Sequence, residues 1–123
     1  MISGTVTRYR EAVVRLHVRG PGGQEEEIEA VIDTGFSDFL TLAPPVIAAL
    51  ALQLAGSMRV TLADGGEIDL DAYISTVEWE GRLLHVSTLA ADGGPLIGMS
   101  LFYGSELRVE VVDGGAVEIR ALA

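Results

Sequence analysis

Short segments separated by glycine-rich turns run through the chain and constrain its fold more than any other feature. The triplet Asp-Gly-Gly occurs three times, beginning at positions 64, 92 and 113. Its flanking residues differ each time, so the triplets are recurrent turns and not parts of a sequence repeat. The segment Glu27–Ile32 begins with alternating polar and apolar residues and ends apolar, as a strand entering a core does. The pattern predicts an all-β, barrel-like protein.

The expected elements are strands joined mostly by such turns, with one or two short helices. Pro44–Leu50 is the best helix candidate, because proline favours the first positions of a helix. Met99–Tyr103 fits a single helical turn that Gly104 would end. The remaining expected elements are a strand at Ala12–Val18, a hairpin of Tyr73–Trp79 with Leu83–Leu89 around Glu80-Gly81, and a hairpin of Leu107–Val112 with Ala116–Leu122 around Asp113-Gly114-Gly115.

The register of a hairpin around the first Asp-Gly-Gly triplet follows from its pattern of apolar residues. A two-residue loop at Asp64-Gly65 would set Leu62 opposite Glu67 and mix apolar with charged residues on one face. A three-residue loop, Asp64-Gly65-Gly66, separates the faces, and glycine at the left-handed position of such a loop is common. We therefore expect the second register, which pairs Leu62 with Ile68, Val60 with Leu70, Met58 with Ala72 and Arg59 with Asp71.

Length and composition indicate a single folded domain over residues 1–123. The chain has 123 residues, of which 49% are hydrophobic, so it can bury a core. No apolar run approaches the roughly 20 residues that span a bilayer, and the start lacks the basic and apolar regions of a signal peptide. The chain has no cysteine, which excludes disulfides, thiol catalysis and thiolate metal sites. We expect a cytoplasmic protein.

The charge of the chain narrows the classes of partner and chemistry. A formal net charge of −10 argues against nucleic acid and anionic membranes as partners. All eight basic residues are arginine. Without lysine, Schiff-base catalysis and a P-loop are excluded.

The residues that carry chemistry follow the apolar end of the segment Val31–Ile32. Asp33 is an ionisable side chain next to a buried-strand pattern, and a buried carboxylate needs hydrogen-bond donors or a partner. Thr34 offers a hydroxyl, and Gly35 lets its backbone N–H approach a carboxylate closely. Taken alone, Asp-Thr-Gly favours a structural turn over a catalytic site.

A second motif changes that balance. Pro95-Leu96-Ile97-Gly98 places two apolar residues before a glycine, and a hairpin with a glycine tip lies between this motif and Asp33. In this order the chain resembles the retropepsin-like aspartic proteases, whose pattern is an apolar strand into Asp-Thr-Gly, a flap hairpin, and then two apolar residues and glycine before a short helix. The resemblance covers nearly the whole chain, although Pro44–Leu54 is longer and more helical than in the retroviral enzymes. It implies a closed all-β barrel that works as a homodimer.

The resemblance also implies roles for individual residues. Asp33 would be the catalytic aspartate, Thr34 would tie two active-site loops together across the dimer axis, and Gly35 would contact the substrate backbone. Gly98 would pack behind the catalytic loop. The residues implied along the substrate groove, or at the flap tip that closes over a peptide, are Ser37, Asp38, Ala63, Asp64, Gly65 and Gly66.

Self-pairing also follows from the chemistry. Amide hydrolysis by carboxyl groups needs one group to activate water and one to protonate the substrate carbonyl oxygen. Two carboxyl groups about 3 Å apart share one proton, because both cannot ionise cheaply. The chain contains one Asp-Thr-Gly, so a twofold axis would supply the second carboxylate. We expect no cofactor and no metal, and as partners a second copy of the chain and a peptide or protein substrate. By resemblance, the terminal strands near Ile2–Gly4 and Glu118–Arg120 would help to build the dimer sheet.

Departures from the family pattern leave alternatives open. Retroviral proteases usually carry an aspartate where this chain has Ser37 and an arginine where it has Met99. Pepsin-like enzymes carry a hydroxyl where this chain has Phe36. The main hypothesis is an aspartic endopeptidase, and the alternative is a dimerisation or peptide-binding module of the same fold with little catalysis. A third class, a structural β domain, would make Asp33 incidental.

Overall fold

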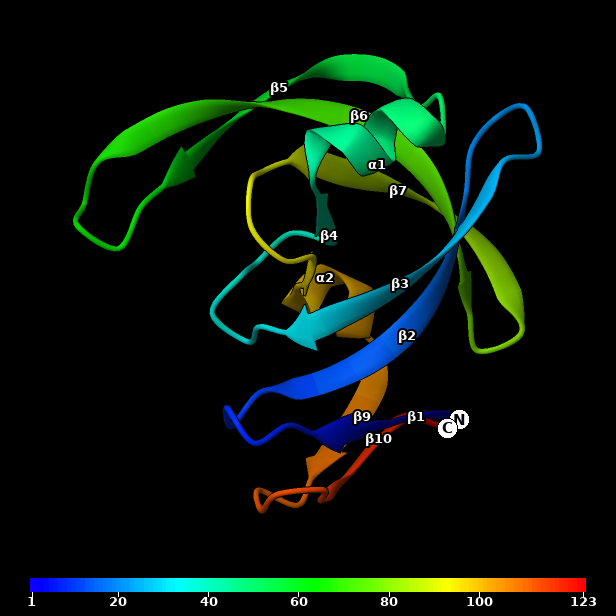
Figure 1. The fold of residues 1–123 in the computed structure, drawn as a ribbon, viewed down its shortest axis with the longest axis vertical. Coiled ribbons are helices and arrows are strands. Elements are labelled where there is room, and N and C mark those ends of the chain that lie inside the picture. Colours follow the sequence, from blue (N-terminus) through cyan, green and yellow to red (C-terminus); the bar gives the residue numbers. More distant parts are fainter.

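The computed structural model describes all residues, 1–123, and consists of one ten-stranded sheet with two short helices (Figure 1). The prediction of an all-β fold with one or two short helices is confirmed. Neither helix has the length and apolar character needed to cross a membrane. The strands are β1 (Ile2–Val6), β2 (Ala12–Arg19), β3 (Glu25–Ile32), β4 (Leu40–Leu42), β5 (Gln53–Thr61), β6 (Glu67–Trp79), β7 (Arg82–Ala90), β8 (Leu96–Ile97), β9 (Ser105–Val109) and β10 (Ala116–Ala121), and the helices are α1 (Pro44–Ala49) and α2 (Met99–Phe102).

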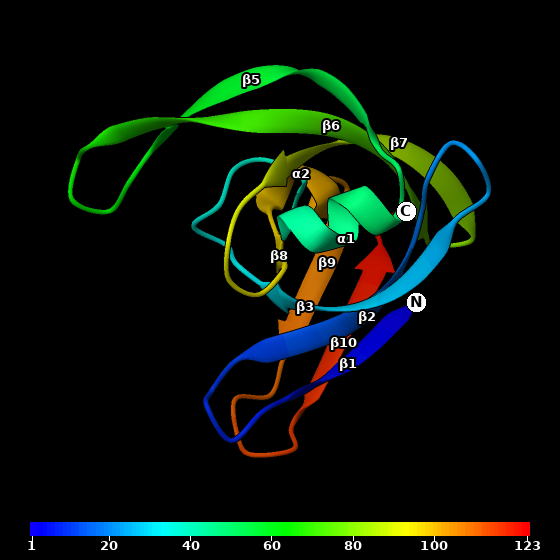
Figure 2. The same ribbon diagram turned by 45° about the horizontal axis from the view of Figure 1, so that its top comes forward.

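The sheet closes on itself as a barrel. Its strands follow the order β5-β6-β7-β4-β8-β3-β2-β1-β10-β9. A further pairing between β2 and β6 sets Val18 opposite Val77 and closes the barrel. Strands β5 and β9 end the order, so each keeps one edge without a partner strand. In Figures 1 and 2 the β5–β6 hairpin projects beyond the rest of the molecule.

Alternation along the strands builds the core. In β2, Leu16 and Val18 are buried, whereas His17 between them is exposed, because successive side chains of a strand point to opposite faces. Trp79 at the end of β6 is also buried, and its ring centroid lies 5.9 Å from that of Phe102 in α2. These side chains therefore join the sheet and α2 in one core.

The hairpin of β6 and β7 turns at Glu80-Gly81, as the sequence predicts. Both turn residues have positive φ, 50° and 75°, which suits a two-residue hairpin turn, and Trp79 pairs with Arg82 across it. The first strand of this hairpin is longer than predicted, because β6 runs without a break from Glu67. One strand thus serves both this hairpin and the projecting β5–β6 hairpin.

The last hairpin departs from its predicted boundaries. Strand β9 ends at Val109, so the prediction that the strand continues to Val112 is wrong. The chain leaves the ladder early because Val112 donates its N–H to the Glu110 carbonyl at 2.9 Å and Gly115 donates its N–H to the Val112 carbonyl at 2.8 Å. The turn therefore begins before Asp113, and not at the Asp-Gly-Gly triplet itself.

The β5–β6 hairpin has a three-residue loop, as predicted, but the loop is Ala63-Asp64-Gly65, one residue earlier than expected. Leu62 donates its N–H to the Gly66 carbonyl at 2.7 Å, and Gly65 takes the left-handed position with φ of +87°. The predicted pairs are therefore wrong by two residues. The pairs in the structure include Val60 with Ile68, Met58 with Leu70 and Arg59 with Asp69.

The terminal strands pair with each other inside one chain. Ile2 lies opposite Ile119 and Ser3 lies opposite Glu118, so both ends of the chain lie on the same side of the molecule (Figure 1). Strand β1 is also paired with β2, and β10 with β9. Neither terminal strand keeps an open edge for a second chain. The expectation that these strands help to build a dimer sheet stays a prediction, and any such sheet would extend from a neighbouring strand.

A buried hydroxyl pair between β6 and β7 offers a test of this packing. Ser75 and Thr88 are buried, and their hydroxyl groups lie 2.7 Å apart. Thr88→Val should lower the free energy of unfolding by about 1–3 kcal/mol, because it leaves the Ser75 hydroxyl buried without this partner. The double variant Ser75→Ala with Thr88→Val should lose less than the sum of the two single variants, as measured by urea unfolding. Strictly additive losses would contradict the pairing.

Candidate active site

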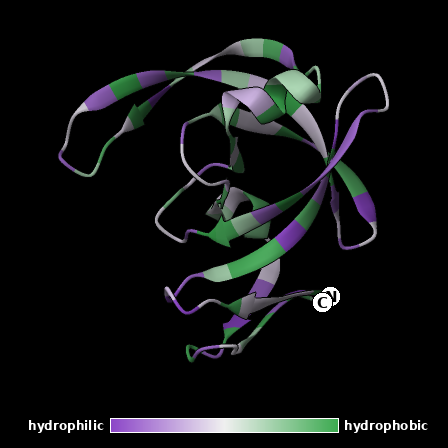
Figure 3. Ribbon diagram, viewed as in Figure 1, coloured by the Kyte–Doolittle hydropathy of each residue, from purple (hydrophilic) through white to green (hydrophobic).

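The parallel pairing of β3 with β8 fixes the position of Asp33. Val31 lies opposite Leu96 and Ile32 opposite Ile97, and the Asp33 N–H donates to the Ile97 carbonyl at 2.9 Å. The hydropathy of β3 explains this local arrangement. The strand changes from hydrophilic residues at its start to hydrophobic residues at its end (Figure 3). The apolar end enters the core, and Asp33 follows at the point where the strand emerges.

The turn after β3 holds the Asp33 carboxylate in place. Gly35 donates its backbone N–H to Asp33 Oδ1 at 2.9 Å, and Phe36 donates its N–H to the Asp33 carbonyl at 3.1 Å. A Cβ atom at Gly35 would lie 3.3 Å from Asp33 Oδ1, which is a tight contact. Asp33 is half-buried and Gly35 is exposed, so the carboxylate is oriented by backbone and still reachable from solvent.

The backbone at Gly98 packs against this turn and binds it through hydrogen bonds. Gly98 donates its N–H to the Phe39 carbonyl at 3.0 Å, and Met99 donates its N–H to the Phe36 carbonyl at 2.8 Å. A Cβ atom on Gly98 would collide with the Asp38 carbonyl oxygen and with the Phe36 ring and carbonyl oxygen. The close approach of the two backbones therefore requires glycine at this position.

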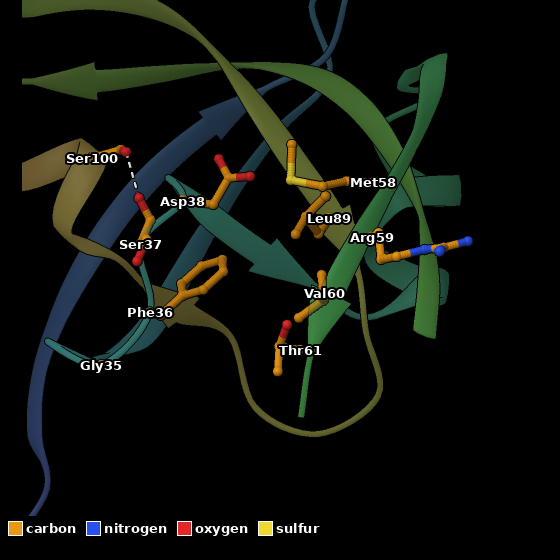
Figure 4. A pocket seen from close by; sticks show the side chains of 10 residues that line it. All are labelled: Gly35, Phe36, Ser37, Asp38, Met58, Arg59, Val60, Thr61, Leu89 and Ser100. Carbon is orange, nitrogen blue, oxygen red and sulfur yellow. Dashed lines mark hydrogen bonds between the residues drawn. The ribbon is translucent and has the colours of Figure 1, made fainter. Parts of the chain in front are cut away.

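The first turn of α2 also holds the loop. The Ser100 hydroxyl donates to the Ser37 carbonyl at 2.5 Å, and the Ser100 N–H donates to the Asp38 carbonyl at 3.3 Å (Figure 4). The Asp38 carboxylate accepts the N–H of Phe39 at 2.8 Å. The loop after Asp33 is thus tied to α2 through both backbone and side chain.

A cavity of about 600 Å³ opens between this loop and the β5–β6 hairpin (Figure 4). Phe36 forms one side of the cavity, and Met58, Val60 and Leu89 bring apolar side chains to the other. The Arg59 side chain points away from it and lies 3.2 Å from Asp69. The cavity therefore combines apolar walls with polar atoms of the loop, as small-molecule and substrate sites commonly do. The residues lining the cavity are Gly35, Phe36, Ser37, Asp38, Met58, Arg59, Val60, Thr61, Leu89 and Ser100.

Two solved structures resemble this chain over most of its length. The EIAV protease in complex with the inhibitor HBY-793 is 15% identical with a TM-score of 0.56, covering 78% of this chain and 88% of that protein. A retropepsin-like aspartic protease from Rickettsia conorii is 16% identical with a TM-score of 0.58, covering 98% and 90%. The chain has a retropepsin-like fold. No protein-family model matches its sequence, and no curated protein matches it either.

Within this retropepsin-like fold, the predicted residues are not all brought to one cavity. Gly35, Ser37 and Asp38 line the 600 Å³ cavity, whereas Asp33 is not among the lining residues and is connected to them through the hydrogen bond from Gly35. Thr34 is exposed and lines a different cavity of about 300 Å³, toward α2 and β9. None of the four residues predicted at the flap tip lines either cavity; these are Ala63, Asp64, Gly65 and Gly66.

The β5 residues that line the cavity, among them Met58 and Val60, are not among the residues predicted from the sequence. Met58 and Val60 line the cavity across from Phe36 (Figure 4), while the tip of the hairpin projects beyond the rest of the molecule (Figure 1). The predicted loop drew attention to the tip, because glycine and aspartate mark turns clearly. The alternation of Met58 and Val60 on the apolar face of the hairpin was the signal that would have identified them.

No group of three or more histidine, aspartate or glutamate side chains in this structure is arranged to hold a metal ion. His17 lies 3.2 Å from Glu27, and His85 lies 2.9 Å from the Thr76 hydroxyl, each on the surface of a strand pair. The two histidines therefore have local partners in the sheet.

Substitution of Gly98 tests the backbone contact behind the site. Gly98→Ala should lower the free energy of unfolding by about 1–3 kcal/mol, because the added Cβ overlaps the backbone of the loop after Asp33. Gly94→Ala is the matched control, since no atom lies within 4 Å of a Cβ there, and it should change stability by less than about 0.5 kcal/mol. Equal urea-unfolding midpoints for the two variants would contradict the predicted contact.

Proposed function

We propose that the protein is a homodimeric aspartic endopeptidase that hydrolyses peptide bonds with a water nucleophile. The observation that carries the proposal is the Asp33 turn, in which the carboxylate accepts the N–H of Gly35 at 2.9 Å and Gly35 itself lines a cavity of about 600 Å³. The retropepsin-like fold supports the same assignment, since both similar structures are described as proteases.

The chemistry requires two carboxyl groups, and each chain offers one Asp-Thr-Gly. In the dimer the Asp33 carboxylates of two chains share one proton. The ionised group takes a proton from water as the oxygen attacks the peptide carbonyl carbon, and the protonated group gives its proton to the carbonyl oxygen. The tetrahedral intermediate then collapses and its C–N bond breaks, as the carboxyl group that took the proton from water gives it to the leaving nitrogen and the other carboxylate takes a proton from a hydroxyl group of the intermediate. No cofactor or metal takes part in these steps.

The surrounding residues would position the substrate. Gly35 presents its backbone at the cavity, and Ser37 and Asp38 lie along the same wall. The apolar side chains of Met58 and Val60 would contact a substrate side chain from the hairpin. The flap tip, Ala63–Gly66, would move toward the peptide when it closes, because it projects past the cavity in this structure.

A second candidate keeps the fold without the catalysis. Phe36 follows Asp-Thr-Gly and lines the cavity with its ring, so this position offers no hydroxyl beside the Asp33 turn. This observation favours a dimerising peptide-binding module with weak or no hydrolysis. The cytoplasmic location expected from the cysteine-free sequence stays a prediction for either function.

Hydrolysis of a diverse peptide library between about pH 4 and pH 7 separates the two functions. Asp33→Asn should lower the turnover number by about 10²-fold or more, because the amide cannot act as base or share the proton. Asp92→Asn, in an exposed loop, is the matched control and should leave turnover unchanged.

Three outcomes of this assay are informative. Cleavage that Asp33→Asn abolishes supports the endopeptidase. Peptide binding without cleavage in the wild-type protein supports the second candidate. Cleavage that survives Asp33→Asn at the wild-type rate would remove Asp33 from the mechanism.

A further inference from the structure

Strand β9 has an open edge whose hydrogen-bonding groups are set by its pairing with β10. Glu110 donates its N–H to the Ala116 carbonyl and Leu122 donates its N–H to the Gly104 carbonyl, both at 2.9 Å and both in the β9–β10 register. Hydrogen bonding alternates along an antiparallel strand, so the even-numbered residues of β9 face β10. The backbone N–H and C=O groups of the odd-numbered residues therefore face the open edge; these are Ser105, Leu107 and Val109.

The sequence of β9 is complementary to itself. Glu106 and Arg108 flank Leu107, and all three belong to one strand. If two β9 strands pair antiparallel about a twofold axis at Leu107, Glu106 of each chain lies opposite Arg108 of the other. The two Leu107 residues then form a hydrogen-bonded pair, which matches the direction of their free backbone groups. Opposite charges at facing positions stabilise such a pair.

The ion pairs that Glu106 and Arg108 make within the chain do not prevent them from pairing with a second β9 strand. Arg108 lies 4.0 Å from Glu110 and 4.0 Å from Glu118, and Glu106 lies 4.0 Å from Arg120. These distances are long for ion pairs, and exposed pairs contribute little to stability. Both side chains of β9 are therefore free to turn toward a second strand.

The other open edge, on β5, lacks these properties. Its ladder with β6 shifts register between Leu54 and Gly56, and a bulge disrupts continuous pairing on an edge. Arg59 is the charged residue of β5, and it already lies 3.2 Å from Asp69 and 3.6 Å from Glu67. An antiparallel pair of β5 strands would have no opposite charge to set against it.

The open edge of β9 lies next to the candidate active site. Leu107 and Ser105 line the 300 Å³ cavity together with Thr34, the residue that follows Asp33. Two apolar side chains at this cavity are left in solvent, because Met99 is 48% exposed and Tyr103 is 91% exposed. A second chain on this edge would cover apolar surface and would lie beside the Asp33 turn.

We propose that the second copy of this chain docks on the open edge of β9, antiparallel and with Leu107 opposite Leu107. This surface replaces the terminal strands, whose edges are both occupied within the chain. Its role in catalysis rests on the proposed function, because it would supply the second Asp33 carboxylate. The pairing itself does not depend on catalysis and can be tested separately.

The absence of cysteine from the chain allows a direct cross-linking test. Hydrogen-bonded partners in an antiparallel pair have Cα atoms about 5.5 Å apart, a distance that a disulfide can bridge. Leu107→Cys should therefore form a covalent dimer under mild oxidation. Ser105→Cys is the matched control, since it would face Val109 of the other chain and not its own copy, and it should form at least about tenfold less covalent dimer at equal concentration.

A charge exchange tests the same register without a covalent bond. Glu106→Arg should weaken dimerisation about tenfold or more in sedimentation, because two arginines then face each other at both ends of the pair. Adding Arg108→Glu to that variant should restore it. Arg120→Glu is the matched control. Arg120 lies opposite Glu106 within the same chain but outside the proposed interface, so this variant should leave dimerisation unchanged.

The outcomes separate the interface from the function. Specific cross-linking of Leu107→Cys with retained peptide hydrolysis supports both. Specific cross-linking without hydrolysis in any variant or in the wild type overturns the endopeptidase and leaves the interface standing. Two results overturn the β9 interface whether or not the protein cleaves peptides. One is equal cross-linking of the two cysteine variants, and the other is a double variant, Glu106→Arg with Arg108→Glu, that does not recover dimerisation.

Discussion

The hydrogen bond from the Asp33 N–H to the Ile97 carbonyl, at 2.9 Å, ends a short parallel ladder on which the rest of the site depends. This ladder joins two segments that lie far apart in the sequence. It sets Asp33 at the end of β3 and brings Gly98 directly behind the turn that follows. Because Gly98 lacks a Cβ atom, α2 can approach and bind the loop through Met99 and Ser100. The orientation of the carboxylate is thus a property of backbone packing.

Much of this could be predicted from sequence, because the motifs combine local geometry with chemistry. Asp33 and Gly35 follow an apolar strand, and a lone carboxylate there needs a donor, which the Gly35 N–H supplies at 2.9 Å. Gly98 was expected behind the loop by resemblance, and its backbone contacts explain the glycine. The short helices were also foreseen, from the position of Pro44 and from Gly104.

The error in the β5–β6 register arises because side-chain alternation along a strand has a period of two. A hairpin register shifted by two residues keeps every side chain on the same face, so apolar pattern could not distinguish Val60 opposite Leu70 from Val60 opposite Ile68. Turn geometry decides between them, and here Gly65 takes the left-handed position. The pairing of terminal strands is likewise a long-range choice that no local pattern reveals.

In the proposed dimer, two strongly acidic chains with a net charge of −10 each repel one another. Local complementarity must overcome that repulsion at the contact. Strand β9 provides alternating charges of opposite sign beside exposed apolar side chains, whereas β5 provides one arginine that is already paired. The edge of β9, next to Thr34, therefore combines unpaired backbone groups with charges that can reduce the repulsion between two chains.

The dependence of specific activity on protein concentration tests the shared active site most directly. If each site needs Asp33 from two chains, hydrolysis per chain should fall on dilution in step with the dimer fraction measured by sedimentation under the same conditions. Constant hydrolysis per chain at concentrations where sedimentation finds a single subunit would contradict the account.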